Sequence, residues 1–259
     1  MSFNLYKRVI LFIILTLALL PFYLPVFLLS RFRICKRIML EIRKIWSLAV
    51  IKIVGVKLSV KGERYKSQVY VSNHVSWIDI LVLNAILDIV FVSKREVKSW
   101  PGLGLLAILA KTIFIERNSL TALTQKDLLE ECLKQRQSIC FFPEGTSTDG
   151  LNVKPFKSAL FSICIPKDKQ SGGKGSIQPI TLKYHSPFIN DPGFYSFWRE
   201  EETIFQNIRK ILSSSKVGSV EIVLHAPLFF KNYEDRKALS LDCFEIIKNE
   251  LISRRLESS

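Results

Sequence analysis

The chain opens with a long apolar stretch. Val9 to Ser30 form 22 residues without a charged side chain, and as one straight helix they would extend roughly 33 Å, enough to cross a bilayer core. Pro21 and Pro25 lie inside the stretch, and because proline removes a backbone donor and clashes with the preceding turn, we expect a kink or break near Leu20. The part before Pro21 is too short to span the bilayer alone. The pattern therefore allows two arrangements, a kinked span and a re-entrant hairpin in one leaflet.

A second helix is predicted for residues 39–56, where apolar side chains recur at helical spacing. These side chains are Met39, Ile42, Ile45, Trp46, Ala49 and Ile53. An amphipathic helix of this kind can lie along the bilayer surface, or it can pack on the domain that follows. The pattern favours neither arrangement.

After residue 56 short β-rich runs alternate with helical stretches, which is typical of an α/β fold. Strands are predicted at 56–61, 68–72, 89–93, 112–116, 138–142, 177–184 and 219–225. Helices are predicted at 77–87, 102–110, 120–136, 156–164, 200–213 and 236–255. We therefore expect a central, mostly parallel or mixed sheet flanked by helices, preceded by an apolar membrane-attached segment.

The length of 259 residues suits one α/β domain plus an appendage. The predicted division is an N-terminal membrane-associated helical segment at 1–55 and one α/β domain at 56–259. The glycine-rich segment 167–176 lacks the residue order of a phosphate-binding loop, so it is interpreted as a flexible connection.

Charge and composition together indicate a membrane surface as partner. The chain is 48% hydrophobic, and its 37 Lys and Arg against 23 Asp and Glu give a formal charge of +14. Six of the basic residues and no acidic ones fall in residues 1–37, which leaves 31 − 23 = +8 for the remainder. Such clusters attract anionic lipid headgroups. Because no zinc-finger spacing, RNA-binding signature or basic zipper helix occurs, nucleic acid is not expected as a partner.

The flanks of the apolar segment predict its orientation. Lys7 and Arg8 precede it as in a secretory signal peptide, but no small-x-small cleavage site occurs before Arg31. The basic residues that follow favour keeping the domain on the cytoplasmic side, as at a bacterial inner membrane. The five cysteines are odd in number, far apart and without a C-x-x-C pair, so we expect neither a disulfide framework nor a metal site.

Histidine is the usual general base, and the chain has three. His185 and His225 have no carboxylate at an informative spacing. His74 directly follows the predicted strand 68–72, at the carboxyl end where α/β sheets bind ligands, and Asp79 comes five residues later. In a continuous helix the two side chains would point about 140° apart. A turn before a helix that begins near Ser76 would bring them together.

A paired His74 and Asp79 would suit acyl transfer. Asp79 would fix the imidazole tautomer while His74 takes a proton. No G-x-S-x-G elbow occurs for a nucleophilic serine, so the nucleophile would be the hydroxyl of the substrate. The alternative, more frequent on spacing alone, is that Ser76-x-x-Asp79 is only a capping box at a helix start.

Four sequence blocks carry a resemblance to a known family. They are Asn73-His74-x4-Asp79, Ile113-Phe114-Ile115-Glu116-Arg117, Phe142-Pro143-Glu144-Gly145-Thr146-Ser147 and Ile177-Gln178-Pro179-Ile180. Their order resembles that of the glycerolipid acyltransferases, the 1-acylglycerol-3-phosphate acyltransferase family. One departure is Gln178, where the family frequently has valine.

The resemblance implies a role for each block. His74 and Asp79 would be catalytic, Arg117 would recognise phosphate, and the third block would bind the acceptor through Glu144, Gly145, Thr146 and Ser147. Lys157 lies near that block and would add positive charge. Glu144 would repel an anionic acceptor, so we expect it to bind an acceptor hydroxyl or to hold Arg117.

The resemblance also implies the substrates. The acyl donor would be a thioester of coenzyme A or acyl carrier protein, with no metal and no further cofactor. The expected acceptor is a lysophospholipid, foremost lysophosphatidic acid. A bacterial lyso-ornithine-lipid acyltransferase shares the blocks, so lyso-ornithine lipid is the alternative acceptor. A non-catalytic, membrane-anchored lipid-binding protein is the alternative outside enzymes.

Overall fold

A computed structural model of the chain describes residues 3–116, 129, 131–133, 135, 137–165, 175–197 and 202–253. Its α-helices are α1 (Phe3–Leu28), α2 (Arg33–Val54), α3 (Ile78–Ile86), α4 (Leu103–Leu109), α6 (Ile204–Ser213) and α7 (Arg236–Ser253). Its strands are β1 (Val56–Gly62), β2 (Val69–Ser72), β3 (Ile89–Lys94), β4 (Ile113–Ile115), β5 (Ser138–Phe141), β6 (Ser176–His185), β7 (Gly218–Leu224) and β8 (Leu228–Phe229). Short 3-10 helices are η1 (Arg95–Ser99), η3 (Leu160–Ile163) and η5 (Phe230–Asn232).

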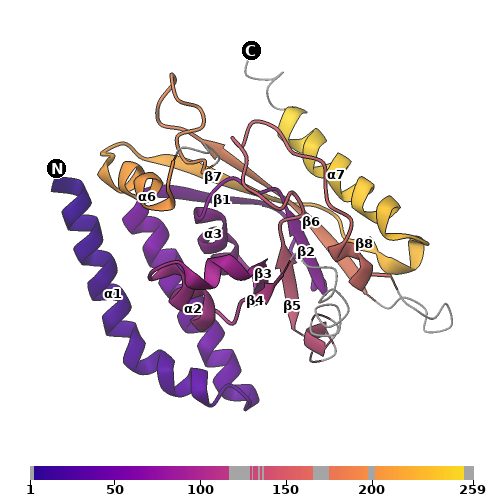
Figure 1. Cartoon of the computed structure of the whole chain (residues 1–259), viewed down its shortest axis with the longest axis horizontal. Coiled ribbons are helices and arrows are strands. Elements are labelled where there is room, and N and C mark those ends of the chain that lie inside the picture. Colours follow the sequence, from indigo (N-terminus) through magenta and orange to yellow (C-terminus); the bar gives the residue numbers. More distant parts are fainter. Residues whose placement is uncertain are drawn as a thin grey trace. The chain divides into compact units, whose positions relative to one another are not determined.

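The strands form one sheet in the order β1-β7-β6-β2-β5-β3-β4, with β8 paired to β6. β2 runs parallel to β5 and β6, and β3 runs parallel to β4 and β5, whereas β8 is antiparallel to β6. The predicted fold, a mixed sheet with flanking helices after an apolar helix, is therefore confirmed (Figure 1).

The chain divides into two compact units. One contains Met1–Ser59, Val75–Asp88 and Tyr184–Val220, and the other contains Val60–His74, Ile89–Lys183 and Glu221–Ser259. This division differs from the ranges 1–55 and 56–259, which stay a prediction about domains.

The second unit has its core on the central strands. β2 is buried along its whole length, as expected for a Val-rich strand covered on both faces. Helix α7 packs against η3 and buries Leu239, Cys243 and Ile247 in the cluster that holds Val69 and Val71. This rigid centre fixes the place where β2 ends.

The first unit is built from helices. α1 and α2 pack together in opposite directions (Figure 1), and α2 also packs on α3. One face of α2 is buried through residues that include Met39, Val50 and Val54, while Ile34 and Ile45 are exposed. Of the two arrangements open for the second helix, packing on the domain is present, and it leaves an apolar face outside.

Two elements differ from expectation. Of the kink or break expected near Leu20, the break is absent: α1 is continuous through Pro21 and Pro25, and its ribbon bends without breaking (Figure 1), because each proline removes only one hydrogen bond. The predicted helix 156–164 is a turn followed by the short η3, where the hydrogen bonds are three residues apart, as from Ser162 N–H to Ala159 at 3.2 Å and from Cys164 N–H to Phe161 at 3.0 Å. η1 and β8 were not predicted. Most of 120–136 and of 167–176 lies outside the described residues.

Candidate active site

Four neighbouring strands of the second unit end at one edge of the sheet. β2, β5, β3 and β4 are parallel neighbours, so their carboxyl ends point the same way. Their registers place Val71, Phe141, Val92 and Ile113 in one row across the strands. Three residues after this row, where the chain leaves each strand, come His74, Glu144, Arg95 and Glu116. Three of the four sequence blocks thus reach the same edge, where α/β sheets bind ligands.

His74 is half-buried and held on three sides. Its ring stacks on Phe142 with centroids 4.2 Å apart and planes 15° from parallel. Its backbone N–H donates to Glu144 Oε1 at 2.7 Å, and its carbonyl accepts from Thr148 N–H at 2.9 Å and from Thr148 Oγ1 at 3.2 Å. The third block is therefore folded against the histidine, and the position of the ring is fixed before a ligand arrives.

Asn73 fixes the end of β2 from the other side. Its side-chain amide donates to the carbonyl of Leu182 at 3.0 Å, and its Oδ1 accepts from Leu182 N–H at 2.8 Å. The side chain is fully buried, so this paired contact is shielded from water. It ties the segment that carries His74 to β6.

Glu144 has a structural role that the sequence did not predict. It is buried, and while Oε1 accepts from His74 N–H, Oε2 accepts from Lys154 N–H at 2.7 Å. Carboxylate bonds to backbone amides are among the stronger hydrogen bonds in proteins. Glu144 thus clamps the end of β2 to the loop after β5. Its expected action on an acceptor hydroxyl or on Arg117 stays a prediction.

The other residues that were predicted to bind the acceptor lie on the same loop. Gly145 has a φ of +72°, a left-handed conformation that glycine adopts without strain, and its N–H donates to Phe142 at 3.1 Å. Thr146 is exposed, Ser147 is half-buried, and Lys157 is exposed. Arg117 lies outside the described residues.

Asp79 belongs to the first unit, where it is fully buried. Its Oδ2 accepts from the N–H groups of Val75 at 2.7 Å and Ser76 at 2.9 Å, and its Oδ1 accepts from the Tyr184 hydroxyl at 2.7 Å. Ser76 Oγ in turn accepts from Ile78 N–H at 3.4 Å. Half of a capping box is therefore present before α3: Asp79 reaches back to the Ser76 N–H, whereas the Asp79 N–H donates to the Ser76 backbone carbonyl at 3.1 Å and not to its hydroxyl. The pairing of Asp79 with His74 stays a prediction.

Tyr184 was missed by sequence reasoning. Burial, together with the neighbouring Asp79 carboxylate, raises the pKa of Tyr184 well above its ordinary value. The phenol therefore remains a hydrogen-bond donor to Asp79 throughout the neutral range. No local pattern identifies it, since it lies 105 residues after Asp79. Thr148 was also missed, although its place directly after the third block was a usable signal.

The other histidines have different surroundings. His225 Nε2 lies 2.8 Å from Thr181 Oγ1, and burial lowers the pKa of His225. His185 is exposed at the end of β6. His74 is the histidine that combines the sheet edge with the folded loop of the third block.

A sequence model of the Acyltransferase family matches residues 56–183. Among curated proteins, the lyso-ornithine lipid O-acyltransferase of Rhodobacter capsulatus is 38% identical over 207 residues, which cover 79% of this chain and 73% of that protein. The 1-acyl-sn-glycerol-3-phosphate acyltransferase of Neisseria gonorrhoeae is 35% identical over 139 residues, covering 51% and 50%.

A solved structure is similar over nearly the whole chain. It is the 1-acyl-sn-glycerophosphate acyltransferase of Thermotoga maritima, with a TM-score of 0.68 and coverage of 97% of this chain and 98% of that one. At 18% identity this likeness shows the fold.

Proposed function

The chain belongs to the acyltransferase family, and from this premise we propose that it transfers a fatty acyl group from an acyl thioester to the free hydroxyl of a lysolipid. One observation carries the proposal: the loop of the third block is hydrogen-bonded to the backbone of His74 on both its N–H and its carbonyl. Base and acceptor-binding loop are thus built as one rigid part of the second unit.

The proposed reaction uses His74 as general base. Its neutral imidazole removes the proton from the acceptor hydroxyl while the hydroxyl oxygen attacks the thioester carbonyl carbon. The tetrahedral intermediate then collapses, the carbon–sulfur bond breaks, and the leaving thiolate receives the proton from the imidazolium. No acyl-enzyme forms, and the scheme uses no metal ion and no cofactor besides the thioester of coenzyme A or acyl carrier protein.

Asp79 is proposed to orient His74 and to stabilise its imidazolium form. The support is its confinement: three donors hold the carboxylate in one orientation. A carboxylate fixed in this way loses little conformational entropy when it accepts a further hydrogen bond. Capping the helix and serving the histidine are therefore compatible roles.

Two acceptors fit the proposal. Lysophosphatidic acid is favoured by the motif blocks and by the name of the Neisseria relative. Lyso-ornithine lipid is favoured by the name of the Rhodobacter relative, which is 38% identical and matches 79% of this chain. Parallel assays with both acceptors and one acyl-coenzyme A decide between them through the ratio of the two kcat/KM values.

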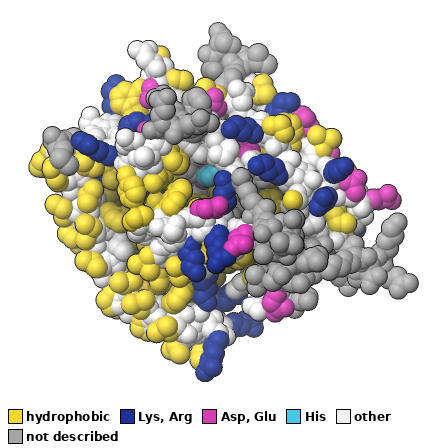
Figure 2. Space-filling model, viewed as in Figure 1, with side chains coloured by type: hydrophobic (Ala, Val, Ile, Leu, Met, Phe, Trp, Pro, Cys, Tyr) yellow, Lys and Arg dark blue, Asp and Glu magenta, His cyan; other side chains and the backbone are white. Residues whose placement is uncertain are grey.

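We propose that the protein acts at the surface of a lipid bilayer. Among the described residues, α1 is long and apolar enough to cross a membrane by length and composition, and 6% of its most apolar window is buried. Figure 2 shows hydrophobic side chains gathered on the side where Figure 1 labels α1 and α2. A core helix or a signal sequence can meet the same criteria of length and hydropathy. We propose the cytoplasmic face of a bacterial inner membrane, from the basic residues at 31–37.

The proposal is tested by replacing His74 with alanine in the full chain. Because general base catalysis contributes about 10²- to 10⁴-fold, kcat should fall by about that factor, while membrane attachment and the unfolding midpoint stay unchanged. Thioester consumption in purified membranes is the measurement. His185→Ala, at an exposed position, is the matched control and should keep full activity. Substantial acyl transfer by the His74→Ala variant would refute the mechanism, and a wild type that consumes no thioester would indicate a non-catalytic lipid-binding protein.

A further inference from the structure

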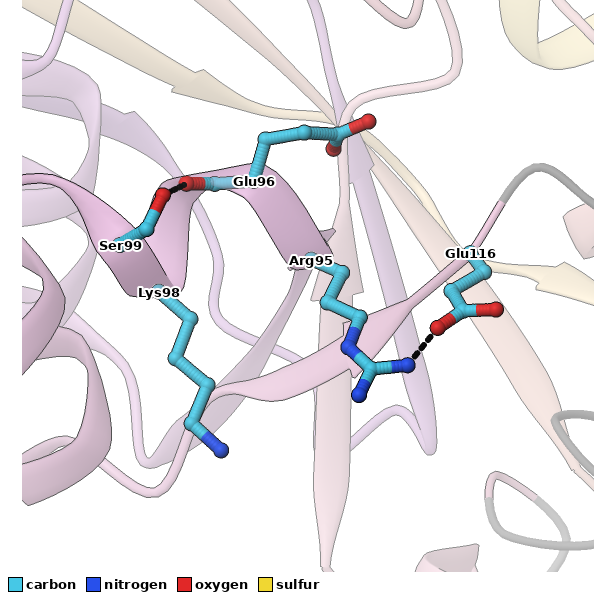
Figure 3. A pocket seen from close by; sticks show the side chains of 5 residues that line it. All are labelled: Arg95, Glu96, Lys98, Ser99 and Glu116. Atoms are coloured by element: carbon cyan, nitrogen blue, oxygen red, sulfur yellow. Dashed lines mark hydrogen bonds and ion pairs between the residues drawn. The ribbon is translucent and has the colours of Figure 1, made fainter.

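An open pocket lies beside His74's sheet edge in the second unit. Its volume is about 630 Å³, and its lining residues are Arg95, Glu96, Lys98, Ser99 and Glu116. Four of them come from η1, which follows β3, and Glu116 follows β4. Figure 3 shows Arg95 and Lys98 extending from the same side of η1, while Glu116 meets Arg95 from the end of β4. The pocket is thus formed where two parallel strands end.

Among the described residues that line the pocket, positive and negative charges balance. Arg95 and Lys98 are cationic, Glu96 and Glu116 are anionic, and Ser99 is neutral. Arg95 Nη1 forms an ion pair with Glu116 Oε1. A guanidinium has five N–H donors in a planar fork, so Arg95 can hold a second carboxylate while it keeps Glu116 in place. A dianionic phosphate would gain from the two cations and be repelled by the two carboxylates. A ligand with one ammonium and one carboxylate finds a partner for each charge.

The distance from His74 is set by the sheet. From β2 the order runs through β5 to β3 and β4, so the pocket's strands are two and three places away from the strand that carries His74. At about 4.8 Å per strand, this separation is about 10 to 14 Å. His74, Arg95 and Glu116 each come one or two residues after the end of a parallel strand, so all three leave the sheet at the same edge.

We propose that this pocket receives a zwitterionic amino-acid headgroup on the acceptor lipid, with Arg95 and Lys98 binding its carboxylate and Glu116 or Glu96 its ammonium. The inference rests on the proposed acyl transfer and names the substrate class, an ornithine-type lysolipid. The acceptor would lie along the sheet edge, with its hydroxyl at His74 and its headgroup between β3 and β4.

Molecular reach supports this assignment over a phosphate. In a lysolipid with ornithine amide-linked to a hydroxyacyl chain, about nine bonds separate the hydroxyl from the terminal ammonium, roughly 11 Å when extended. In lysophosphatidic acid the free hydroxyl and the phosphorus are about four bonds apart, roughly 5 Å. The headgroup of the longer acceptor covers the separation to β3 and meets the pocket side chains that extend from η1, while the phosphate of the shorter one stays near His74.

The test measures acceptor binding and turnover separately. Full-length chain carrying His74→Ala is titrated with lyso-ornithine lipid and with lysophosphatidic acid in detergent micelles, with and without Glu116→Gln or Lys98→Met. We expect each pocket substitution to raise the Kd for lyso-ornithine lipid about five- to tenfold and to leave the Kd for lysophosphatidic acid within twofold. In the enzyme with His74 intact, KM for lyso-ornithine lipid should rise by a similar factor while kcat and the KM for acyl-coenzyme A are kept.

The control substitutions are Glu245→Gln and Lys248→Met on α7. These two residues are exposed, with Lys248 Nζ 3.9 Å from Glu245 Oε1, and the substitutions remove the same charges away from the pocket. They should change neither Kd. An unchanged Kd for lyso-ornithine lipid in both pocket variants would overturn the proposal. So would an equal rise in the Kd values of both lipids, or a change in the KM for acyl-coenzyme A alone. The proposal also fails if the His74→Ala parent does not bind lyso-ornithine lipid. The proposed acyl transfer is judged apart from this, by whether the wild type acylates either lysolipid.

Discussion

At the scale of single residues, the candidate site depends on side chains that hold other groups in place. Both oxygens of Asp79 accept hydrogen bonds, and so do both oxygens of Glu144. Loss of a donor would loosen either carboxylate, because each hydrogen bond to a buried acceptor contributes to holding it in place. The hydrogen bonds that hold each of these two carboxylates therefore determine which groups it can act on.

Tyr184→Phe tests this at Asp79. Removing the hydroxyl takes away one of the three donors that hold the carboxylate, so Asp79 should orient His74 less firmly. We expect kcat to fall about three- to tenfold while the KM values of donor and acceptor are kept. The measurement is acyl transfer at saturating concentrations of both substrates.

Tyr195→Phe is the matched control for that experiment. The Tyr195 hydroxyl accepts from Gly218 N–H at 2.8 Å in the same unit, so this substitution removes a phenolic hydroxyl without removing a donor to Asp79. It should lower stability and leave kcat unchanged. An unchanged kcat for Tyr184→Phe would argue against a role of Tyr184 in positioning Asp79.

At the scale of elements, the end of α4 carries backbone strain. Lys111 has a φ of +58°, a left-handed conformation that disfavours residues with a Cβ. Its N–H donates to Ile108 at 2.9 Å and Thr112 N–H donates to Ala107 at 3.0 Å, the helix-ending pattern that usually has glycine at this position. This turn directs the chain from α4 into β4, whose end forms part of the pocket.

Lys111→Gly should relieve the strain and raise the free energy of unfolding by about 0.5 to 1 kcal/mol. Ala110→Gly, one residue earlier in a right-handed helical conformation, should lower it by about the same amount. Denaturant unfolding of the full chain in detergent measures both. A destabilised Lys111→Gly variant would mean that contacts of the lysine side chain outweigh the backbone strain.

At the scale of the whole molecule, membrane attachment is assigned to exposed apolar side chains of the N-terminal helices. Ile14 and Leu17 are 59% and 60% exposed on α1. Apolar area of this kind is stabilised in lipid and costly in water. The attachment is thus separate from the chemistry at His74.

Leu17→Arg should weaken membrane attachment, since an arginine at the centre of an inserted helix costs about 2.5 to 3.5 kcal/mol. Vesicle sedimentation should show more of this variant in the supernatant than of wild type. Leu241→Arg on α7, at a position 57% exposed, serves as control and should sediment like wild type. Equal sedimentation of Leu17→Arg and wild type would exclude insertion of this part of α1.

The sequence by itself determined the strands, the long helices and the order of the blocks. Strand positions follow from short β-rich runs, and α1 follows from 22 uncharged residues, because burial and lipid contact select apolar side chains locally. The family blocks are local as well, which is why His74, Asp79 and the third block were identified. Local pattern failed at 156–164, where the chain forms a turn and a short 3-10 helix although its apolar residues recur at helical spacing.

Only the tertiary structure shows which groups the residues of the sequence blocks contact and that these residues meet at one sheet edge. The bond from His74 to Glu144 joins residues 70 positions apart, and the one from Tyr184 to Asp79 spans 105. The strand order that brings Arg95 and Glu116 to the same sheet edge as His74 depends on which strands become neighbours. These long-range contacts form when long loops close and strands join one sheet. The periodicity within a single segment does not predict them.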